Sequence, residues 1–296
     1  MAPSNDAVAR SNEHAPSPDV HTAGIDTAGI TMVAVHAHPD DETLATGLAL
    51  ARHCLAGSQV HVITATLGEE GEVIPAELAD LEGSEALGPY RHSELQAAMA
   101  ALGVEHHYLG ASDARPRPRW RDSGMAGSEA AAHPRAFAAA DGAEVGSVLA
   151  ADLRAIRPDV LLTYDPLGGY EHPDHIKTHQ LCVEALRSLE PGERPRMYVV
   201  ATPLSWASED RAWLRQHVPA DAGLELLTDA DPYPPSVADD SLVSDTITDA
   251  KAGQLRTAAL RHHRTQVTVY EGYFALSNDI AARLSDREGY REWPIK

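Results

Sequence analysis

Short apolar runs alternate with helical patterns along most of the chain after residue 30. Five runs have the length and composition of β-strands, at 31–36 (TMVAVH), 59–67 (QVHVITATL), 106–109 (HHYL), 159–164 (DVLLTY) and 197–202 (MYVVAT). Helical periodicity separates most of them, over residues 43–56, 90–102, 144–156, 173–189 and 246–263. This alternation predicts an α/β protein with a Rossmann-like, mostly parallel sheet and helices on both faces.

The remaining segments divide the chain into a tail, a single domain and long loops. Residues 1–29 are rich in Ser, Pro, Ala, Asp and Gly without sustained periodicity, which predicts a flexible N-terminal tail. Residues 30–296 have the length of one domain with one large core. Pro, Gly and Asp punctuate 110–142 and 219–245, which we expect to form long loops or a smaller C-terminal subdomain.

The composition limits the partners that the chain can have. A net charge of −20 opposes general binding to nucleic acid or anionic membranes, so a small-molecule substrate is expected. Cys54 and Cys182 are the two cysteines, too few for a disulfide framework, and they favour a reducing, cytoplasmic location. No apolar run reaches the roughly 18 residues of a membrane span. The sequence leaves the oligomeric state open.

The first stretch with recognisable chemistry is VAVHAHPDDETLATG, residues 33–47, which directly follows the first predicted strand. Ligands of open parallel sheets bind beyond the carboxyl ends of the strands, where His38 to Glu42 fall. A nucleotide-binding turn would be rich in glycine, whereas adjacent carboxylates repel a phosphate and one another unless a cation lies among them. The cluster therefore indicates a metal site, with simple capping of the following helix as the alternative.

A second H-P-D turn follows another predicted strand, in TYDPLGGYEHPDHIKTH, residues 163–179. His172 and His175 are three residues apart at a helix start, so their rings can converge, and His179 lies one turn further. Two such turns after two parallel strands strongly favour a metal centre over helix capping. The other histidines, His263 among them, are expected to be ordinary strand or surface residues.

The residue types define a hydrolytic centre. His38, Asp41 and His175 form a set of two imidazoles and one carboxylate, which suits one divalent ion, Zn²⁺ or alternatively Fe²⁺, with a position left open for water. Asp40 is adjacent to a ligand and cannot easily share the metal with it. Its carboxylate is therefore predicted to be the general base.

Three further residues of the second turn are candidates for supporting the reaction. A tetrahedral oxyanion needs a hydrogen-bond donor, which either His172, if cationic, or the hydroxyl of Tyr170 can supply. Asp174 is expected to orient His172, as carboxylates commonly fix an imidazole tautomer.

These two turns also resemble a known family. HPDDE (38–42) and GGYEHPDH (168–175) are similar to the signature turns of the LmbE/PIG-L family of metal-dependent N-deacetylases, and the resemblance runs from about residue 31 to the C-terminus. Within it, TLGEEGEV (66–73), PYRHSEL (89–95), YLGASD (108–113) and WRDSGMAG (120–127) resemble the mycothiol-biosynthesis branch. The resemblance implies the same ligands and base, and hydrolysis of the acetamide of N-acetyl-glucosaminyl-inositol to acetate and a free amine.

The resemblance also implies which residues contact the substrate. Arg91, Asp122 and Glu72 match the family's polyol-binding arginine, aspartate and glutamate, although Arg91 could equally be a helix-surface residue. RPRPRWR (115–121) is expected to be a loop over the sugar site, and ALRHHRTQ (259–266), which echoes a C-terminal family pattern, to be structural.

Two other functions stay open. The similar mycothiol S-conjugate amidases share both turns but carry Thr-Gly-Gly-Glu-Arg-Gly where this chain has TLGEEG (66–71). They also tend to have a lysine shortly after the first turn, where this chain has Leu44 and Ala45. Those departures favour the deacetylase. The other alternative is a non-catalytic, metal-stabilised sugar-binding protein, which would need no base beside the metal; Asp40 argues against it.

Overall fold

The computed structural model describes residues 24–112 and 114–296. Residues 1–23 of the predicted tail lie outside the described residues. The tail was predicted to extend to residue 29, and this boundary is wrong: Ile25 is fully buried in the core, and its carbonyl oxygen accepts a hydrogen bond from His53 Nε2 at 2.6 Å. The folded part therefore begins before residue 30.

The central sheet is the predicted one, extended by two strands at one edge. Its order is β3-β2-β1-β4-β5-β12-β8. The first five strands are parallel, and β12 runs antiparallel to both β5 and β8. Their bounds are β1 Thr31–His36, β2 Gln59–Thr64, β3 Glu105–Tyr108, β4 Val160–Thr163, β5 Arg196–Val200, β8 Asp245–Thr248 and β12 Arg287–Glu292. The Rossmann-like α/β class is confirmed.

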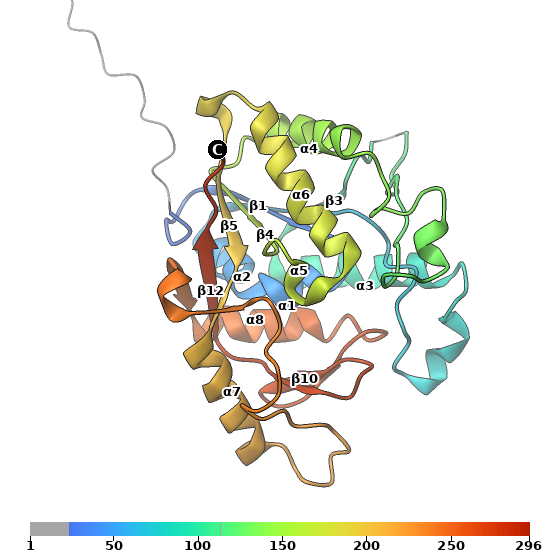
Figure 1. Cartoon of the computed structure of the whole chain (residues 1–296), viewed down its shortest axis with the longest axis vertical. Helices are drawn as coiled ribbons and strands as arrows, with labels where there is room; N and C mark the ends of the chain where they lie inside the picture. Colours follow the sequence, from blue (N-terminus) through green and yellow to red (C-terminus); the bar gives the residue numbers. More distant parts are fainter. Residues whose placement is uncertain (1–23, 113) are drawn as a thin grey trace, which may run out of the picture.

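Helices cover both faces of this sheet, as the pleat of β1 requires (Figure 1). Met32 and Ala34 pack with one helical layer, whereas Val33 and Val35 pack with the other. The first layer contains α2 (Gly47–Leu55), α3 (Leu87–Leu102) and α8 (Ala250–Leu260); the second contains α4 (Gly142–Ile156) and α6 (Pro173–Ser188). The predicted helix 43–56 is two helices, α1 (Asp41–Ala45) and α2, separated at Thr46.

A smaller C-terminal unit packs beside the sheet. It contains α7 (Leu204–His217), the antiparallel strands β9 (Thr268–Val269), β10 (Tyr273–Ala275) and β11 (Ala281–Arg283), and the short parallel pair β6 (Thr202–Pro203) and β7 (Val237–Ala238). Figure 1 shows α7 and β10 at the bottom of the molecule. The predicted helix 246–263 was wrong at its start, because residues 246–248 belong to β8, which pairs with β12 from a distant part of the sequence. Within residues 24–112 and 114–296 there are also four 3-10 helices, η1 (Ala76–Leu81), η2 (Ala130–Ala132), η3 (Pro191–Glu193) and η4 (Asp240–Leu242).

The strand order places both H-P-D turns together. The chain runs from β1 outward through β2 and β3, then returns to the other side of β1 as β4. The strand order therefore reverses between β1 and β4, which pair in parallel. Ligands of doubly wound folds bind at this reversal, beyond the carboxyl ends of the strands. The turn after β1 and the segment after β4, which includes α5 (Gly168–Glu171), lie there.

Among the described residues, no helix is long and apolar enough to cross a membrane.

Candidate active site

The turn after β1 has an unusual backbone conformation. Asp40 has φ 108° and ψ −33°, a region that residues with a side chain seldom adopt. Its carbonyl oxygen accepts hydrogen bonds from Thr43 N and Leu44 N, which begins α1. Its own N–H donates to Glu42 Oε2 at 3.0 Å. This strained conformation directs the carboxylates of Asp40, Asp41 and Glu42 into the protein, where all three are buried.

Three donor atoms from the two turns converge on one point. His38 Nδ1 lies 3.2 Å from His175 Nε2, and Asp41 Oδ2 lies 3.3 Å from each of these nitrogens. The Nδ1 atom of His175 donates to the Gly168 carbonyl oxygen at 3.1 Å, so its Nε2 presents a lone pair. Two imidazole nitrogens and a carboxylate oxygen at this spacing need a positive charge between them, either a proton on His38 Nδ1 or a metal ion in its place. Adjacent ligands of tetrahedral zinc, with bonds of about 2.0–2.2 Å, are separated by about 3.3–3.6 Å, so the donor set fits such an ion.

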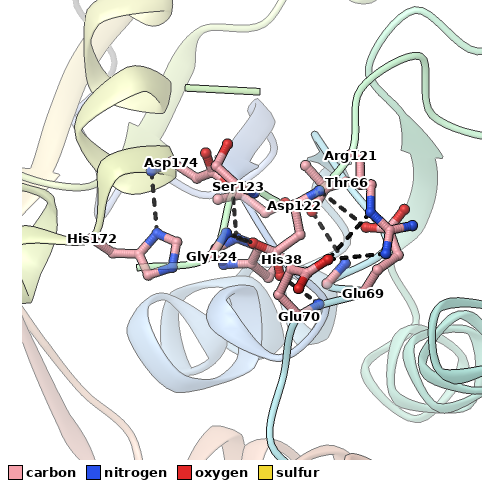
Figure 2. Close-up of polar contacts among 12 residues, drawn as sticks. His38, Thr66, Glu69, Glu70, Arg121, Asp122, Ser123, Gly124, His172 and Asp174 are labelled. Atoms are coloured by element: carbon pink, nitrogen blue, oxygen red, sulfur yellow. Dashed lines mark hydrogen bonds and ion pairs between the residues drawn. The ribbon is translucent and has the colours of Figure 1, made fainter. Parts of the chain in front are cut away.

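The opposite nitrogen of His38 faces two other carboxylates (Figure 2). His38 Nε2 lies 3.2 Å from Asp174 Oδ2 and 3.3 Å from Asp122 Oδ1, so Nε2 carries a proton and Nδ1 is the nitrogen that can give its proton up to a metal ion. Burial lowers the pKa of His38, but Asp122 and Asp174 outweigh it and raise the pKa well above its ordinary value. The same contact with His38 holds the pKa of the Asp122 carboxyl well below its usual range. Carboxylates in this arrangement fix a ligand histidine and increase its basicity.

The expected role of Asp174 is therefore corrected. Its carboxylate accepts hydrogen bonds from His38 Nε2 and, at 2.9 Å, from Ser123 N, and none from His172. It is the backbone N–H of Asp174 that contacts His172, donating to Nδ1 at 3.2 Å (Figure 2). His172 is the N-cap of α6, and its ring nitrogen satisfies an N–H that the helix itself cannot. The sequence could not distinguish these two uses of one residue.

His172 and Tyr170 lie beside the convergence point. The ring centroid of His172 is 4.7 Å from that of His38, and one nitrogen of His172 lies within 4.8 Å of one nitrogen each of His38 and His175. Burial, together with the charges of His38 and His175, lowers the pKa of His172 to about 4, so the ring is neutral at pH 7 with its proton on Nε2. Tyr170 is half exposed, and its ring packs edge-on against His175. Burial of its hydroxyl and the charge of Asp41 raise the pKa of Tyr170. Both residues remain protonated donors at neutral pH.

Asp40 lies beside Arg91, a residue of α3. Arg91 is buried and donates to the carbonyl oxygens of Gly68 and Pro39, each at 2.6 Å, and to Asp40 Oδ2 at 3.2 Å. Burial raises the pKa of Asp40 to about 7, with Asp41 adding to the rise and Arg91 opposing it. A carboxylate with a pKa near 7 is suited to accepting a proton at neutral pH.

A polar cavity of about 220 Å³ opens onto these groups. Its wall includes the predicted His38, Asp40, Asp41, Arg91, Asp122, Tyr170 and His172, and the unpredicted Glu70, Met125 and Gln266. Glu72 does not line it: its side chain is exposed, and only its carbonyl oxygen is engaged, by Gln266 Nε2 at 2.9 Å. Five of the six residues predicted as ligands, base or oxyanion donors thus lie at one cavity, together with two of the three sugar-contact candidates. The sixth, His175, lies just behind Asp41.

A second, larger cavity adjoins the first. It has a volume of about 480 Å³, and the two share Asp41, Leu44, Tyr170 and Leu276 as walls. The second cavity also contacts His175 and is lined largely by apolar groups of the C-terminal unit, such as Phe274 and Ile280. The candidate centre therefore lies between a polar space and an apolar one.

Two residues that support the site were missed from the sequence. Tyr164, in the strand run DVLLTY, stacks on His175 with centroids 4.1 Å apart, and its hydroxyl accepts a hydrogen bond from Ala37 N at 2.9 Å. His263, which was predicted to be a strand or surface residue, is buried and contacts Glu42 Oε1 at 3.2 Å. Tyr164 could have been noticed as the aromatic end of a buried strand. The signal for His263 was its place in ALRHHRTQ (259–266), which resembles a C-terminal family pattern and was assigned a structural role.

Comparison with known proteins agrees with this geometry. The family model described as "PIG-L: GlcNAc-PI de-N-acetylase" matches residues 33–186, which contain both turns. The chain is 42% identical over 272 residues to a Streptomyces avermitilis protein named 1D-myo-inositol 2-acetamido-2-deoxy-alpha-D-glucopyranoside deacetylase, covering 88% of this chain and 90% of that one.

Solved structures share the fold at low sequence identity. The N,N'-diacetylchitobiose deacetylase of Pyrococcus horikoshii has a TM-score of 0.54 at 18% identity, covering 90% of this chain and 84% of that one. The 4-carboxy-2-hydroxymuconate hydratase of Pseudomonas putida has a TM-score of 0.50 at 18% identity, covering 90% and 97%. The fold alone therefore accommodates different reactions. The family match across both turns and the identity over nearly the whole chain show that this chain belongs to the PIG-L/LmbE family of N-deacetylases.

Proposed function

We propose that the chain hydrolyses the acetamide of 1D-myo-inositol 2-acetamido-2-deoxy-α-D-glucopyranoside, releasing acetate and the free amine used in mycothiol biosynthesis. The substrate follows the name of the relative that is 42% identical over most of both chains. The observation that supports this chemistry is the convergence of His38 Nδ1, His175 Nε2 and Asp41 Oδ2 within 3.3 Å. The carboxylate of Asp40 lies beside these three atoms and is not one of them. The free cysteines Cys54 and Cys182 support a cytoplasmic location for this reaction.

His38, Asp41 and His175 would hold one divalent ion, which we propose is Zn²⁺; two imidazoles and a carboxylate also suit Fe²⁺. When bound, such an ion supplies a Lewis acid that polarises a carbonyl and lowers the pKa of water. Asp174 and Asp122 keep the ring of His38 in the tautomer that this role needs.

The other side chains move and hold protons. Asp40 accepts a proton from the attacking water, and Arg91 keeps its carboxylate turned toward the cavity. The Nε2–H of neutral His172 and the hydroxyl of Tyr170 are placed to donate to the developing oxyanion. The protonated Asp40, or His172, then returns a proton to the leaving amine.

The sugar and inositol hydroxyls would occupy the polar cavity. We propose Arg91 and Asp122 at its wall, with Glu70 and Gln266 as additional polar contacts. Asp122 also contacts His38, and Arg91 also donates to the Gly68 carbonyl oxygen, so both side chains hold other parts of the site in place. Glu72 has no part in this proposal, because its exposed side chain does not reach the cavity.

The second candidate is amidase action on mycothiol S-conjugates, in which the acyl group is much larger than acetyl. The apolar cavity of about 480 Å³ beside Tyr170 favours it, because this cavity contacts His175 and Asp41 and exceeds the needs of a methyl group. The two candidates use the same centre and differ only in the group that is released.

The test measures free amine with fluorescamine after incubation of the metal-loaded protein with N-acetyl-glucosaminyl-inositol, N-acetylglucosamine or a mycothiol S-conjugate. We expect preference for the first substrate and loss of all activity with a chelator. Preference for the conjugate would assign the amidase. If all three substrates stay intact while the protein binds metal and sugar, the chain is a sugar-binding protein.

Asp40→Asn separates catalysis from metal binding. We expect a loss of about 10²–10⁴-fold in kcat, the usual contribution of a general base, with metal content unchanged. Full activity in this variant would show that Asp40 is not the base.

A further inference from the structure

Glu42, the third carboxylate of HPDDE, has no role in the metal set or in proton transfer. Its side chain is fully buried. One oxygen, Oε2, accepts the backbone N–H of Asp40 at 3.0 Å, and the other, Oε1, accepts the hydroxyl of Thr43 at 2.5 Å. Glu42 therefore clamps the turn that contains the proposed base.

The clamp is completed from a distant part of the chain. His263 follows α8 and is 221 residues from Glu42, yet its Nε2 lies 3.2 Å from Glu42 Oε1 with both side chains almost inaccessible. The segment around His263 is itself fixed, because Thr265 donates through its N–H and hydroxyl to the buried carboxylate of Glu94, at 2.9 and 2.6 Å. His263 is thus a rigid donor rather than a mobile surface side chain.

The turn needs such a clamp. Asp40 adopts φ 108° without being glycine, a conformation that persists only where surrounding contacts fix it. The hydrogen bond from Asp40 N to Glu42 acts directly at that strained residue. His263 Nε2, at 3.2 Å from Glu42 Oε1, fixes the carboxylate from the side opposite to its contact with Asp40 N.

We propose that His263 is a positioning residue for the reaction, holding Asp40 in its productive geometry through Glu42. This inference rests on the proposed function only for the role of Asp40; the mechanical link itself is independent of it. His263 touches neither the cavity nor the converging donor atoms, so removing it leaves the metal set and the cavity wall intact.

The experiment compares His263→Ala and His263→Gln with His262→Ala, the exposed neighbour, as matched control. The Gln variant retains an N–H donor near the position of Nε2, so a positioning role predicts rescue. For His263→Ala we expect kcat to fall about 10–100-fold, as for a catalytic group misplaced by up to 1 Å, with KM and metal content unchanged. His262→Ala and, to within about threefold, His263→Gln should resemble wild type.

Hydrogen exchange of the metal-free protein supplies a readout that does not need activity. In His263→Ala we expect faster exchange in the peptide covering residues 37–46 and unchanged exchange in α4, whereas general destabilisation would accelerate both. If His263→Ala does not fold, Glu42→Gln is used; its single carbonyl oxygen cannot accept all three donors, so the same local loosening is expected.

Unchanged exchange at 37–46, or a kcat near wild type in fully loaded His263→Ala, overturns the proposal. If wild type and His262→Ala release no amine from any substrate, the proposed function fails instead, and hydrogen exchange still decides whether His263 fixes the turn.

Discussion

Two adjacent glycines after β4 allow a direct test of whether His175 is a metal ligand. Gly168 and Gly169 both have positive φ, 67° and 77°. A Cβ on Gly168 would lie 2.6 Å from His175 Cβ and 2.8 Å from Ile176 N, whereas a Cβ on Gly169 would meet nothing within 4 Å. Both substitutions place a side chain at positive φ, but only Gly168→Ala adds a contact with His175.

The expected magnitudes follow from this difference. An alanine at positive φ costs about 1–2 kcal/mol of stability or more, and Gly169, with ψ −52°, lies further from the left-handed helical region. Thermal unfolding measures this backbone cost separately for each variant. The clash in Gly168→Ala requires a shift of several tenths of an ångström at the backbone that carries His175, and metal sites tolerate only about 0.2 Å in ligand distance. We expect metal affinity to fall at least about tenfold, or about 1.4 kcal/mol, in Gly168→Ala and to stay near wild type in Gly169→Ala.

The assay is a competition titration of each metal-free variant against a chromophoric chelator, with thermal unfolding in excess chelator as the measure of fold stability. Equal loss of metal affinity in both variants would mean that backbone strain, not the contact with His175, is responsible. Unchanged affinity in a folded Gly168→Ala variant would refute the assignment of His175 as a ligand.

Three other predictions follow from the same contacts. Asp174→Asn should lower metal affinity about 10–100-fold, the usual effect of losing a carboxylate that supports a ligand histidine. The control Asp141→Asn, at the N-cap of α4, should leave metal affinity unchanged. Equal metal affinities in the two variants would contradict the support of His38 by Asp174. Tyr164→Phe leaves one buried N–H without an acceptor, so urea unfolding should show a loss of about 1–3 kcal/mol, and no loss would contradict it. The ion pair of Glu42 and His263 should stabilise the metal-free protein fully between pH 4.5 and 6.5, the ordinary values of the two groups. This contribution is measured as the difference in unfolding free energy between wild type and His263→Gln. The difference should shrink as pH rises through the raised pKa of His263, and also as pH falls through the lowered pKa of Glu42. A difference that stays constant with pH would refute this.

The parts of the fold that the sequence predicted are those whose signal is local. The five parallel strands are short apolar runs that start within one residue of their predicted positions, and three helices, α3, α4 and α6, lie close to their predicted ranges. The two H-P-D turns could be located because each immediately follows such a strand, and parallel strands end at the same edge. Their convergence within 3.3 Å follows from the pairing of β1 with β4, which the strand pattern alone does not specify.

What could not be predicted depends on contacts between distant segments. Strand β8 was assigned to a helix because its partner, β12, is about 40 residues away, and α7 was missed because the apolar stripe of this helix is weak. The carboxylate of Asp174 reaches across to His38 rather than to its neighbour His172, because the helix start already occupies His172 with a backbone N–H. His263 was dismissed because its partner, Glu42, belongs to the other end of the sequence.

The fold itself leaves the reaction undetermined, since a hydratase and a sugar deacetylase both align with this chain at TM-scores of 0.50 and 0.54. The residues that indicate the reaction are those whose buried, charged arrangement would destabilise the protein if it served no function. His38 and His175 direct one ring nitrogen each at the same carboxylate oxygen, and the other nitrogen of each ring is held by a separate hydrogen bond. A buried arrangement of this kind needs a cation between the three atoms, a proton in the metal-free protein and a metal ion in its place when loaded. Asp40 is then kept beside it by a strained backbone and a buried clamp, although it is not needed as a ligand. A protein that only bound a sugar would not need a strained, buried carboxylate held beside the metal set. Hydrolysis therefore explains the site better than sugar binding alone.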